Sequence, residues 1–124
     1  MTFTPEQEDL IKDLRAVQTQ WNDEIALFIH RFQQKVESND LSIFSYDATH
    51  AASLAGIYDV KFSLDDALSR VDEGEEGALN VLRKLVLINM SHVRADSNSV
   101  GTIYRVAAYS RLLAVFTKQE LSLL

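Results

Sequence analysis

One apolar pattern near the start of the chain constrains the fold more than any other feature of the sequence. Between residues 10 and 36, large apolar side chains recur at steps of 4, 3, 4, 4, 3, 4 and 4 residues. The mean step, about 3.7 residues, keeps them on one face of a straight α-helix. These side chains are Leu10, Leu14, Val17, Trp21, Ile25, Phe28, Phe32 and Val36. The pattern predicts one helix from about residue 5 to about residue 37, longer than is typical of globular proteins.

The residues at both ends of this segment support the same helix. Thr4 is a plausible N-cap, and Pro5 falls at the first helical position, where its missing N–H is harmless. Gln7 stands three residues after Thr4, so the two side chains can close a capping box. At the other end, the sequence Glu-Ser-Asn-Asp at residues 37–40 favours a turn over a helix interior.

The rest of the chain also predicts helices, because helix formers dominate and strand-type alternation is absent. The whole chain has one proline and four glycines, so it contains few residues that break helices. Helices are expected from about 45 to 59, over a short stretch at 63–71 capped by Ser63, at 77–93, and from about Val100 to 117 or beyond. The acidic segment 72–77 and the segment 94–101 are expected to be turns. The predicted fold is all-α: a single domain, residues 1–124, with a bundle of four main helices plus one short helix, and with a long N-terminal helix.

The last helix raises a question about what covers it, because residues 105–124 are apolar on nearly every side. A surface helix normally has one apolar stripe and one polar face. Either this helix and the one before it form the centre of the bundle, or part of their surface faces a second subunit. Aromatic residues and arginine dominate the energetics of protein interfaces. The candidate partner-binding residues are therefore Tyr104, Arg105, Tyr109, Arg111, Leu112 and Phe116, with the monomer core as the alternative place for the apolar ones.

Composition and motifs narrow the range of functions. The chain has no cysteine, which excludes disulfides and a thiol nucleophile. Its start lacks the pattern of a secretory signal, and no apolar run approaches the roughly 18 residues of a membrane span. A cytoplasmic protein with no membrane partner is expected. The sequence has no Gly-x-Ser-x-Gly, no glycine-rich phosphate loop and no His-Glu-x-x-His. We therefore expect neither catalysis nor a cofactor or metal.

The uneven distribution of charge suggests an alternative function. The net charge is −6, but residues 1–76 hold six basic and sixteen acidic residues (−10), whereas residues 77–124 hold six basic and two acidic residues (+4). A nucleic-acid-associated helical subunit would use the basic half, with Arg83, Lys84, Arg94, Arg105 and Arg111 as the contact residues. The acidic character of the whole chain and the lack of a dense basic cluster count against this alternative.

A lesser alternative concerns His50. Asp47 precedes it by three residues, a spacing that could hold a metal on one helix face, and the small residues after His50 would suit a histidine phosphotransfer-like role. However, the nearest downstream cation is Lys61, eleven residues later. The simpler interpretation is that Asp47 caps a helix and His50 lies on its surface.

Together these patterns favour a non-enzymatic protein–protein interaction module, such as an adaptor, an inhibitor, an immunity-type protein or an assembly subunit. The expected partner is a protein, and the first candidate is a second copy of the chain, bound through the C-terminal helices as a homodimer.

Overall fold

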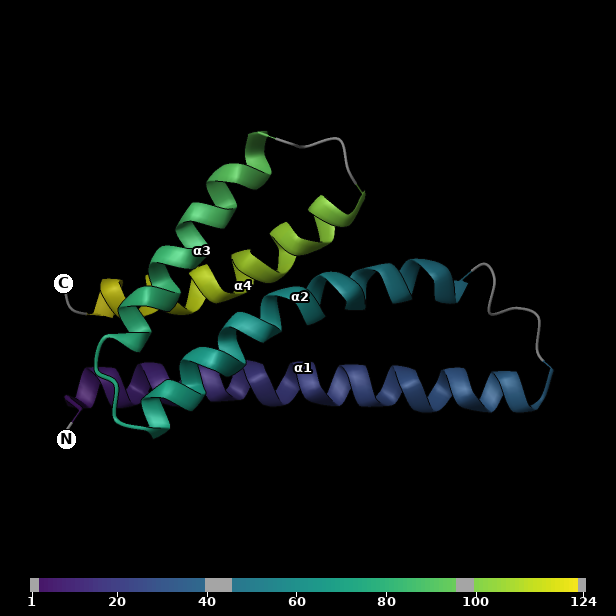
Figure 1. Ribbon diagram of the computed structural model, residues 1–124, viewed down its shortest axis with the longest axis horizontal. Helices are drawn as coiled ribbons and strands as arrows, with labels where there is room; N and C mark the ends of the chain where they lie inside the picture. Colours follow the sequence, from purple (N-terminus) through teal and green to yellow (C-terminus); the bar gives the residue numbers. More distant parts are fainter. Residues whose placement is uncertain (1–2, 40–45, 96–99, 123–124) are drawn as a thin grey trace.

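The computed structural model contains four α-helices and no strand in the part of the chain that it describes, residues 3–39, 46–95 and 100–122 (Figure 1). The all-helical prediction is confirmed. The helices are α1 (Pro5–Glu37), α2 (Tyr46–Asp72), α3 (Ala78–Ala95) and α4 (Val100–Ser122).

The first helix, α1, begins at the predicted capping box. The Thr4 hydroxyl accepts a hydrogen bond from the backbone N–H of Gln7 at 3.1 Å, and the Gln7 side-chain oxygen accepts one from the backbone N–H of Thr4 at 2.9 Å. These two bonds satisfy donors that have no partner inside the helix. At the other end, Ser38 caps the helix and Asn39 takes a left-handed backbone conformation, with φ of 55°. The helix therefore stops within the polar segment that the sequence marked as a turn.

The second helix corrects the sequence prediction, because it is one continuous helix of 27 residues rather than two shorter ones. The fifth, short helix expected at 63–71 is its C-terminal part. Val60 and Leu64 are four residues apart and both fully buried, so the same face continues through the expected break. Lys61 also binds Asp65 at 2.5 Å, one turn further on. Ser63, expected to cap a new helix, lies in the helix interior.

A short turn follows α2, as the sequence predicted for residues 72–77. Gly74 has a φ of 91°, a left-handed conformation that side chains rarely tolerate. There the backbone N–H of Gly74 bonds the carbonyl of Val71 at 3.0 Å, and that of Glu75 bonds Arg70 at 2.9 Å. These bonds satisfy carbonyl groups at the end of α2 and reverse the chain into α3.

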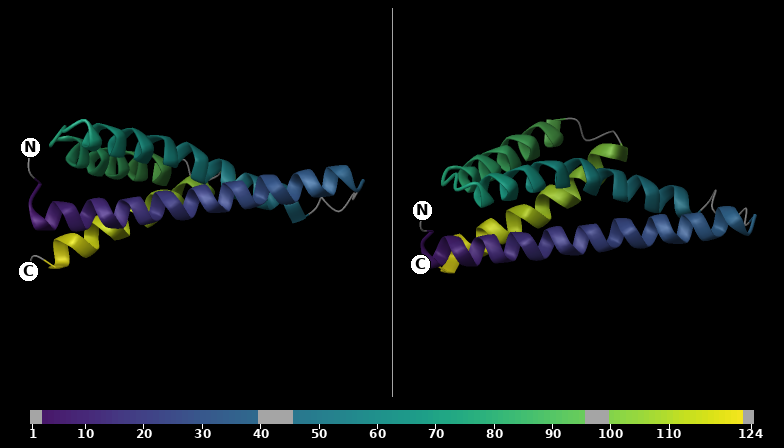
Figure 2. Two further views of the ribbon diagram at one scale, coloured as in Figure 1. Left: turned by 90° about the horizontal axis from the view of Figure 1, so that it is seen from below. Right: turned by 60° about the horizontal axis from the view of Figure 1, so that its bottom comes forward.

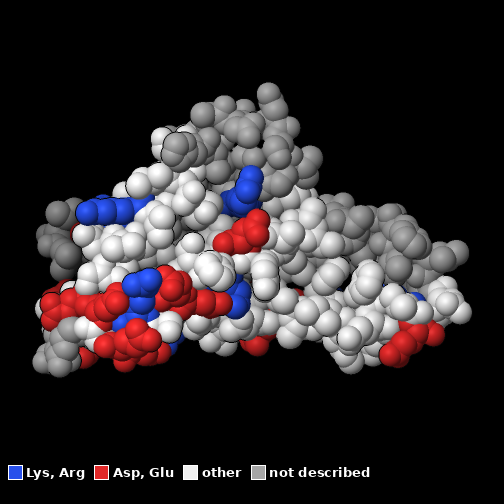
Figure 3. Space-filling model, in the orientation of Figure 1, with Lys and Arg blue, Asp and Glu red and all other residues white. Residues whose placement is uncertain are grey.

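Acidic side chains gather at this end of the molecule, where α1 begins and α2 ends (Figure 3). Two arginines offset part of the charge. Arg15 of α1 binds Asp72 at 2.5 Å, and Arg70 binds Asp66 at 3.0 Å and Glu75 at 3.3 Å. The hydrogen bonds and the charges of Asp66 and Glu75 raise the pKa of the Arg70 guanidinium. All these groups are largely solvent-exposed, so the pairs contribute little stability.

The centre of the bundle is the pair α2 and α4, which pack on each other more extensively than any other two helices. Within the described residues, α1 and α3 do not pack against each other; each lies against α2 and α4 (Figures 1 and 2). The sequence had offered the last two helices as the centre. The sequence prediction did not place α2 at the centre, because it divided residues 45–71 into two helices. Neither of these was long enough to span the bundle.

The hydrophobic core occupies the end of the bundle where the chain termini lie. There α1 contributes Leu14 and Trp21, α2 contributes Leu64, α3 contributes Leu82 and α4 contributes Leu112. Beyond this core, the second half of α1 extends with only the first half of α2 beside it (Figure 1). None of the described helices is long and apolar enough to cross a membrane.

Candidate functional site

The inward face of α4 belongs to the core of the single chain. Tyr109, Leu112 and Phe116, three of the six predicted partner-binding residues, are buried in the cluster to which all four helices contribute. These three side chains therefore lie in the core of the single chain, which was the alternative to a place in an interface. A partner that binds the folded chain would have to use other residues of α4.

Tyr104 lies where α4 passes close to Gly56 of α2. A Cβ atom placed on Gly56 of α2 would stand 2.7 Å from the Tyr104 Cβ and 2.8 Å from its backbone carbon, closer than real carbon atoms approach. The small residues around Gly56 therefore serve the crossing of two helices. Tyr104 is half-buried here and forms part of the packing between helices.

Arg105 lies next to this crossing and is also half-buried. Its Nε atom is buried without a hydrogen-bond partner among the described residues. The neighbouring phenol of Tyr109 has a raised pKa, chiefly because burial disfavours the charged form. The positive charge of Arg105 opposes this rise, and the negative charge of Asp59 adds to it.

Two cations on α4 point toward α1. Arg111 donates a hydrogen bond to the side-chain oxygen of Gln20, and Lys118 lies 3.7 Å from Asp13. A shallow groove of about 350 Å³ runs between α1 and α4 beside them. Arg111, predicted at the rim of an interface, therefore takes part in contacts within the chain.

The basic residues of the nucleic-acid alternative do not form one stripe. Arg83 of α3 binds Glu120 of α4 at 2.6 Å, on the flank of α4 that faces α3. Arg111 lies on the other flank of α4, facing α1. Lys84 is exposed and follows Arg83 directly on α3, where successive residues point in directions about 100° apart. The side chain of Arg94 lies outside the described residues. A continuous basic surface would need these side chains to point the same way.

One face of α4 is formed by six exposed residues, none of which is charged. Four charged residues occur in this helix: the helical repeat places Arg105, Arg111 and Glu120 off this face, and Lys118, which leans toward Asp13 of α1, borders it. We call this surface the α4 outer face. It consists of Ile103, Ala107, Ser110, Ala114, Thr117 and Leu121, all exposed.

The α4 outer face has large apolar side chains at its ends and small ones in its middle. Ile103 is 59% exposed and Leu121 is 63% exposed. Between them, the steps of 4, 3, 4, 3 and 4 residues keep all six positions on one side of the helix. A shallow depression of about 470 Å³ lies over Ala114 and Thr117, with Lys118 at its edge. This face was not predicted from the sequence, because aromatic residues and arginine pointed to other positions, whereas the available signal was the 4-3-4-3-4 spacing of uncharged residues.

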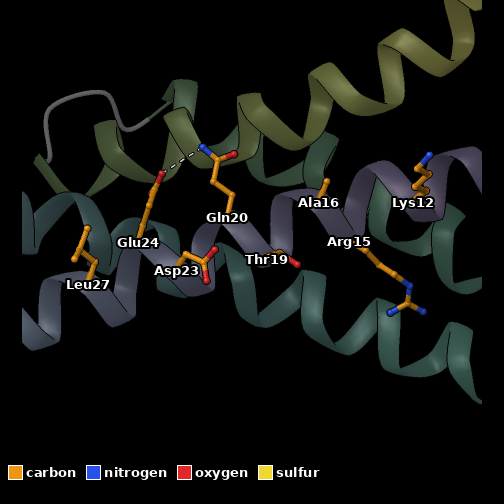
Figure 4. A pocket seen from close by; sticks show the side chains of 8 residues that line it. All are labelled: Lys12, Arg15, Ala16, Thr19, Gln20, Asp23, Glu24 and Leu27. Carbon is orange, nitrogen blue, oxygen red and sulfur yellow. Dashed lines mark hydrogen bonds between the residues drawn. The ribbon is translucent and has the colours of Figure 1, made fainter.

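A larger hollow, about 600 Å³ in volume, lies on the outside of α1. Every residue that lines it comes from this one helix (Figure 4). Ala16 and Thr19 lie in the middle of this row of side chains, with Lys12 at one end and Leu27 at the other (Figure 4). Because no second element closes over it, the hollow is a shallow surface depression and not a cleft that could exclude water from a reaction.

His50 packs edge-on against Phe28 of α1, with ring centroids 5.1 Å apart and an interplanar angle of 77°. The nearest downstream cation, Lys61, is bound to Asp65. Asp47 has no described side chain, so the proposed metal pair falls partly outside the described residues. Within those residues, no group of three or more histidine, aspartate or glutamate side chains is placed to hold a metal ion.

We compared the chain with protein-family models, curated proteins and solved structures. No protein-family model, curated protein or solved structure matches the chain.

Proposed function

We propose that the protein is a non-enzymatic interaction module that self-associates through its C-terminal helix. The single observation that carries the proposal is the uncharged α4 outer face. A helix face that remains in water usually carries charged residues, whereas this one has none over 18 residue steps, or about 27 Å.

The arrangement of side chains on this face suits a second copy of itself. Ile103 and Leu121 are equally distant in sequence from residue 112, so a two-fold axis near that residue would set Ile103 of one copy opposite Leu121 of the other. A two-fold interface uses the same patch on both subunits. The small residues between them would let two antiparallel helices approach closely. The 4-3-4-3-4 spacing is the repeat by which helices pair in coiled coils.

The experiment is a mass measurement by size-exclusion chromatography with light scattering at low and high protein concentration. We expect the native chain to have twice the 14.0 kDa of one chain. Ala114→Glu should reduce the mass to that of one chain, because it would place two unpaired carboxylates near the two-fold axis. Ala114 is exposed in the single chain, so the melting temperature of the monomer should not fall.

Ala26→Glu is the matched control, since Ala26 is exposed on α1 and far from the α4 outer face in the sequence. This variant should keep the mass of the native protein. A native mass of 14.0 kDa at every concentration would refute self-association. A dimer that persists in Ala114→Glu would refute the assignment of the interface to this face.

A further inference from the structure

The α4 outer face continues across a groove onto α1. The depression on this face and the groove between α1 and α4 share two lining residues, Ala114 and Lys118. The groove in turn shares Ala16 and Gln20 with the hollow on the outside of α1. A second copy seated on the α4 outer face would therefore lie beside α1 as well as over α4.

Two contacts within the chain fix how α1 and α4 match along their length. Arg111 bonds Gln20, and Lys118 lies 3.7 Å from Asp13. The two contacts are seven residues apart on each helix and follow opposite directions, so the two helices are antiparallel and advance at the same rate. Glu24 stands four residues beyond Gln20. It is therefore level with a point four residues before Arg111 on α4.

The two-fold pairing proposed above brings a lysine of the second copy to the same level. About an axis near residue 112, Lys118 of the second copy stands opposite residue 106 of the first. Residue 106 is five residues before Arg111, so this lysine and Glu24 differ by one residue, or about 1.5 Å, along the helices. The axis also keeps the flanks of the paired helices on the same side. Lys118 of each copy therefore points to the side on which α1 of the other copy lies.

Both side chains can accept a closer partner. The Lys118 side chain is 77% exposed, and at 3.7 Å its ammonium group is too far from Asp13 for a hydrogen bond. Glu24 lines the hollow on α1 and points to the same side as Gln20 (Figure 4). One of its carboxylate oxygens accepts a long hydrogen bond of 3.4 Å from Gln20. A carboxylate accepts several hydrogen bonds at once, so Glu24 retains capacity for a lysine.

We propose that Lys118 of each copy pairs with Glu24 of the other, so that α1 forms the rim of the interface. The pair depends on the self-association proposed above, because it forms only where two α4 outer faces meet. The charges of the two helices suit it, since α1 has seven acidic and four basic side chains and α4 has three basic and one acidic. Parallel α4 helices would instead bring the two Lys118 side chains level with each other, so the ion pair favours the antiparallel arrangement.

Charge reversal in two separate variants tests the pair. Lys118→Glu and Glu24→Lys should each weaken self-association by about tenfold or more, because a dimer contains two such pairs and each becomes repulsive. An equimolar mixture of the two variants should associate about as tightly as the native chain, since the mixed dimer restores both pairs. Light scattering over a dilution series measures the mass, and circular dichroism should show that both variants remain folded.

Glu37→Lys is the matched control. It makes the same charge change on α1, at an exposed residue thirteen positions, or about 20 Å, from Glu24. This variant should self-associate like the native chain.

A mixture no heavier than either variant alone would overturn the ion pair, as would single variants that dimerise like the native chain. Either result, beside a native dimer that Ala114→Glu disrupts, would leave the proposed function intact. A native mass of 14.0 kDa at every concentration would refute both proposals.

Discussion

The two halves of α1 have the same apolar spacing but different surroundings. In the first half, Leu10, Leu14, Val17 and Trp21 are all buried. In the second half, from residue 22 to residue 37, the stripe continues through Phe32 and Val36, yet no side chain is fully buried. The periodicity of a helix therefore identifies which face is apolar, but not how much of that face other elements cover.

The difference follows from the lengths of the helices. The first half of α1 packs against both α2 and α4, and the second half extends past the end of α4 with α2 alone beside it (Figures 1 and 2). Burial by one neighbour leaves part of an apolar stripe in water. The stabilisation that these apolar residues contribute should therefore fall along α1.

The strongest test of this comparison uses one substitution in both halves. Leu14 is 0% exposed and Leu27 is 50% exposed. Leu14→Ala should lower the free energy of unfolding by about 3–5 kcal/mol, because it removes buried methyl groups and leaves a cavity. Leu27→Ala should change it by about 0.5 kcal/mol or less. Urea denaturation measures both values.

Leu27 lies off the apolar stripe, so a pair within the stripe serves as the control. Val17 is 4% exposed and Val36 is 51% exposed. Val17→Ala should cost about 1.5–3 kcal/mol, whereas Val36→Ala should be close to neutral, since alanine also favours the helix. Equal losses at the two valines would mean that the second half of α1 is covered as fully as the first.

Two glycines allow a second comparison between a closely packed position and an open one. Gly56→Ala should destabilise the protein by about 1–3 kcal/mol, because the new methyl group would overlap the Tyr104 backbone and force α2 and α4 apart. Gly77→Ala meets no atom within 4 Å and should be neutral or stabilising by about 0.4–1 kcal/mol. Thermal melts of the two variants give the comparison. A Gly56→Ala protein as stable as the native one would show that the crossing is looser than the structure indicates.

The smallest effect concerns pH. Burial raises the pKa of Tyr109 above the ordinary tyrosine value of 10.0. The neutral phenol is therefore favoured in the folded state. Its contribution to stability is complete below about pH 10 and is lost as the pH rises through the higher folded pKa. Between about pH 8 and about pH 11, the urea midpoint of the native protein should fall further than that of Tyr109→Phe. Parallel falls would show that Tyr109 does not titrate differently in the two states.

The candidate sites were only partly predictable from the sequence. The surplus of apolar residues in the last helix indicated that this helix either forms the core or faces a partner. It does not indicate which side chains do each, because that depends on the direction in which α2 and α3 pack. The aromatic residues chosen as partner contacts turned inward, and small residues remained outside.

The sequence by itself determined the helical class, the start of α1 at the Thr4 capping box and the turn at residues 72–77. These features depend on interactions among neighbouring residues: a side chain bonding a backbone group three residues away, or a glycine that permits a left-handed turn. Only the tertiary structure decided that α2 is continuous, that α2 and α4 form the centre, and that half of the α1 stripe remains partly in water. Those outcomes depend on contacts between residues far apart in the chain, and local patterns carry no information about the distance or direction of such contacts.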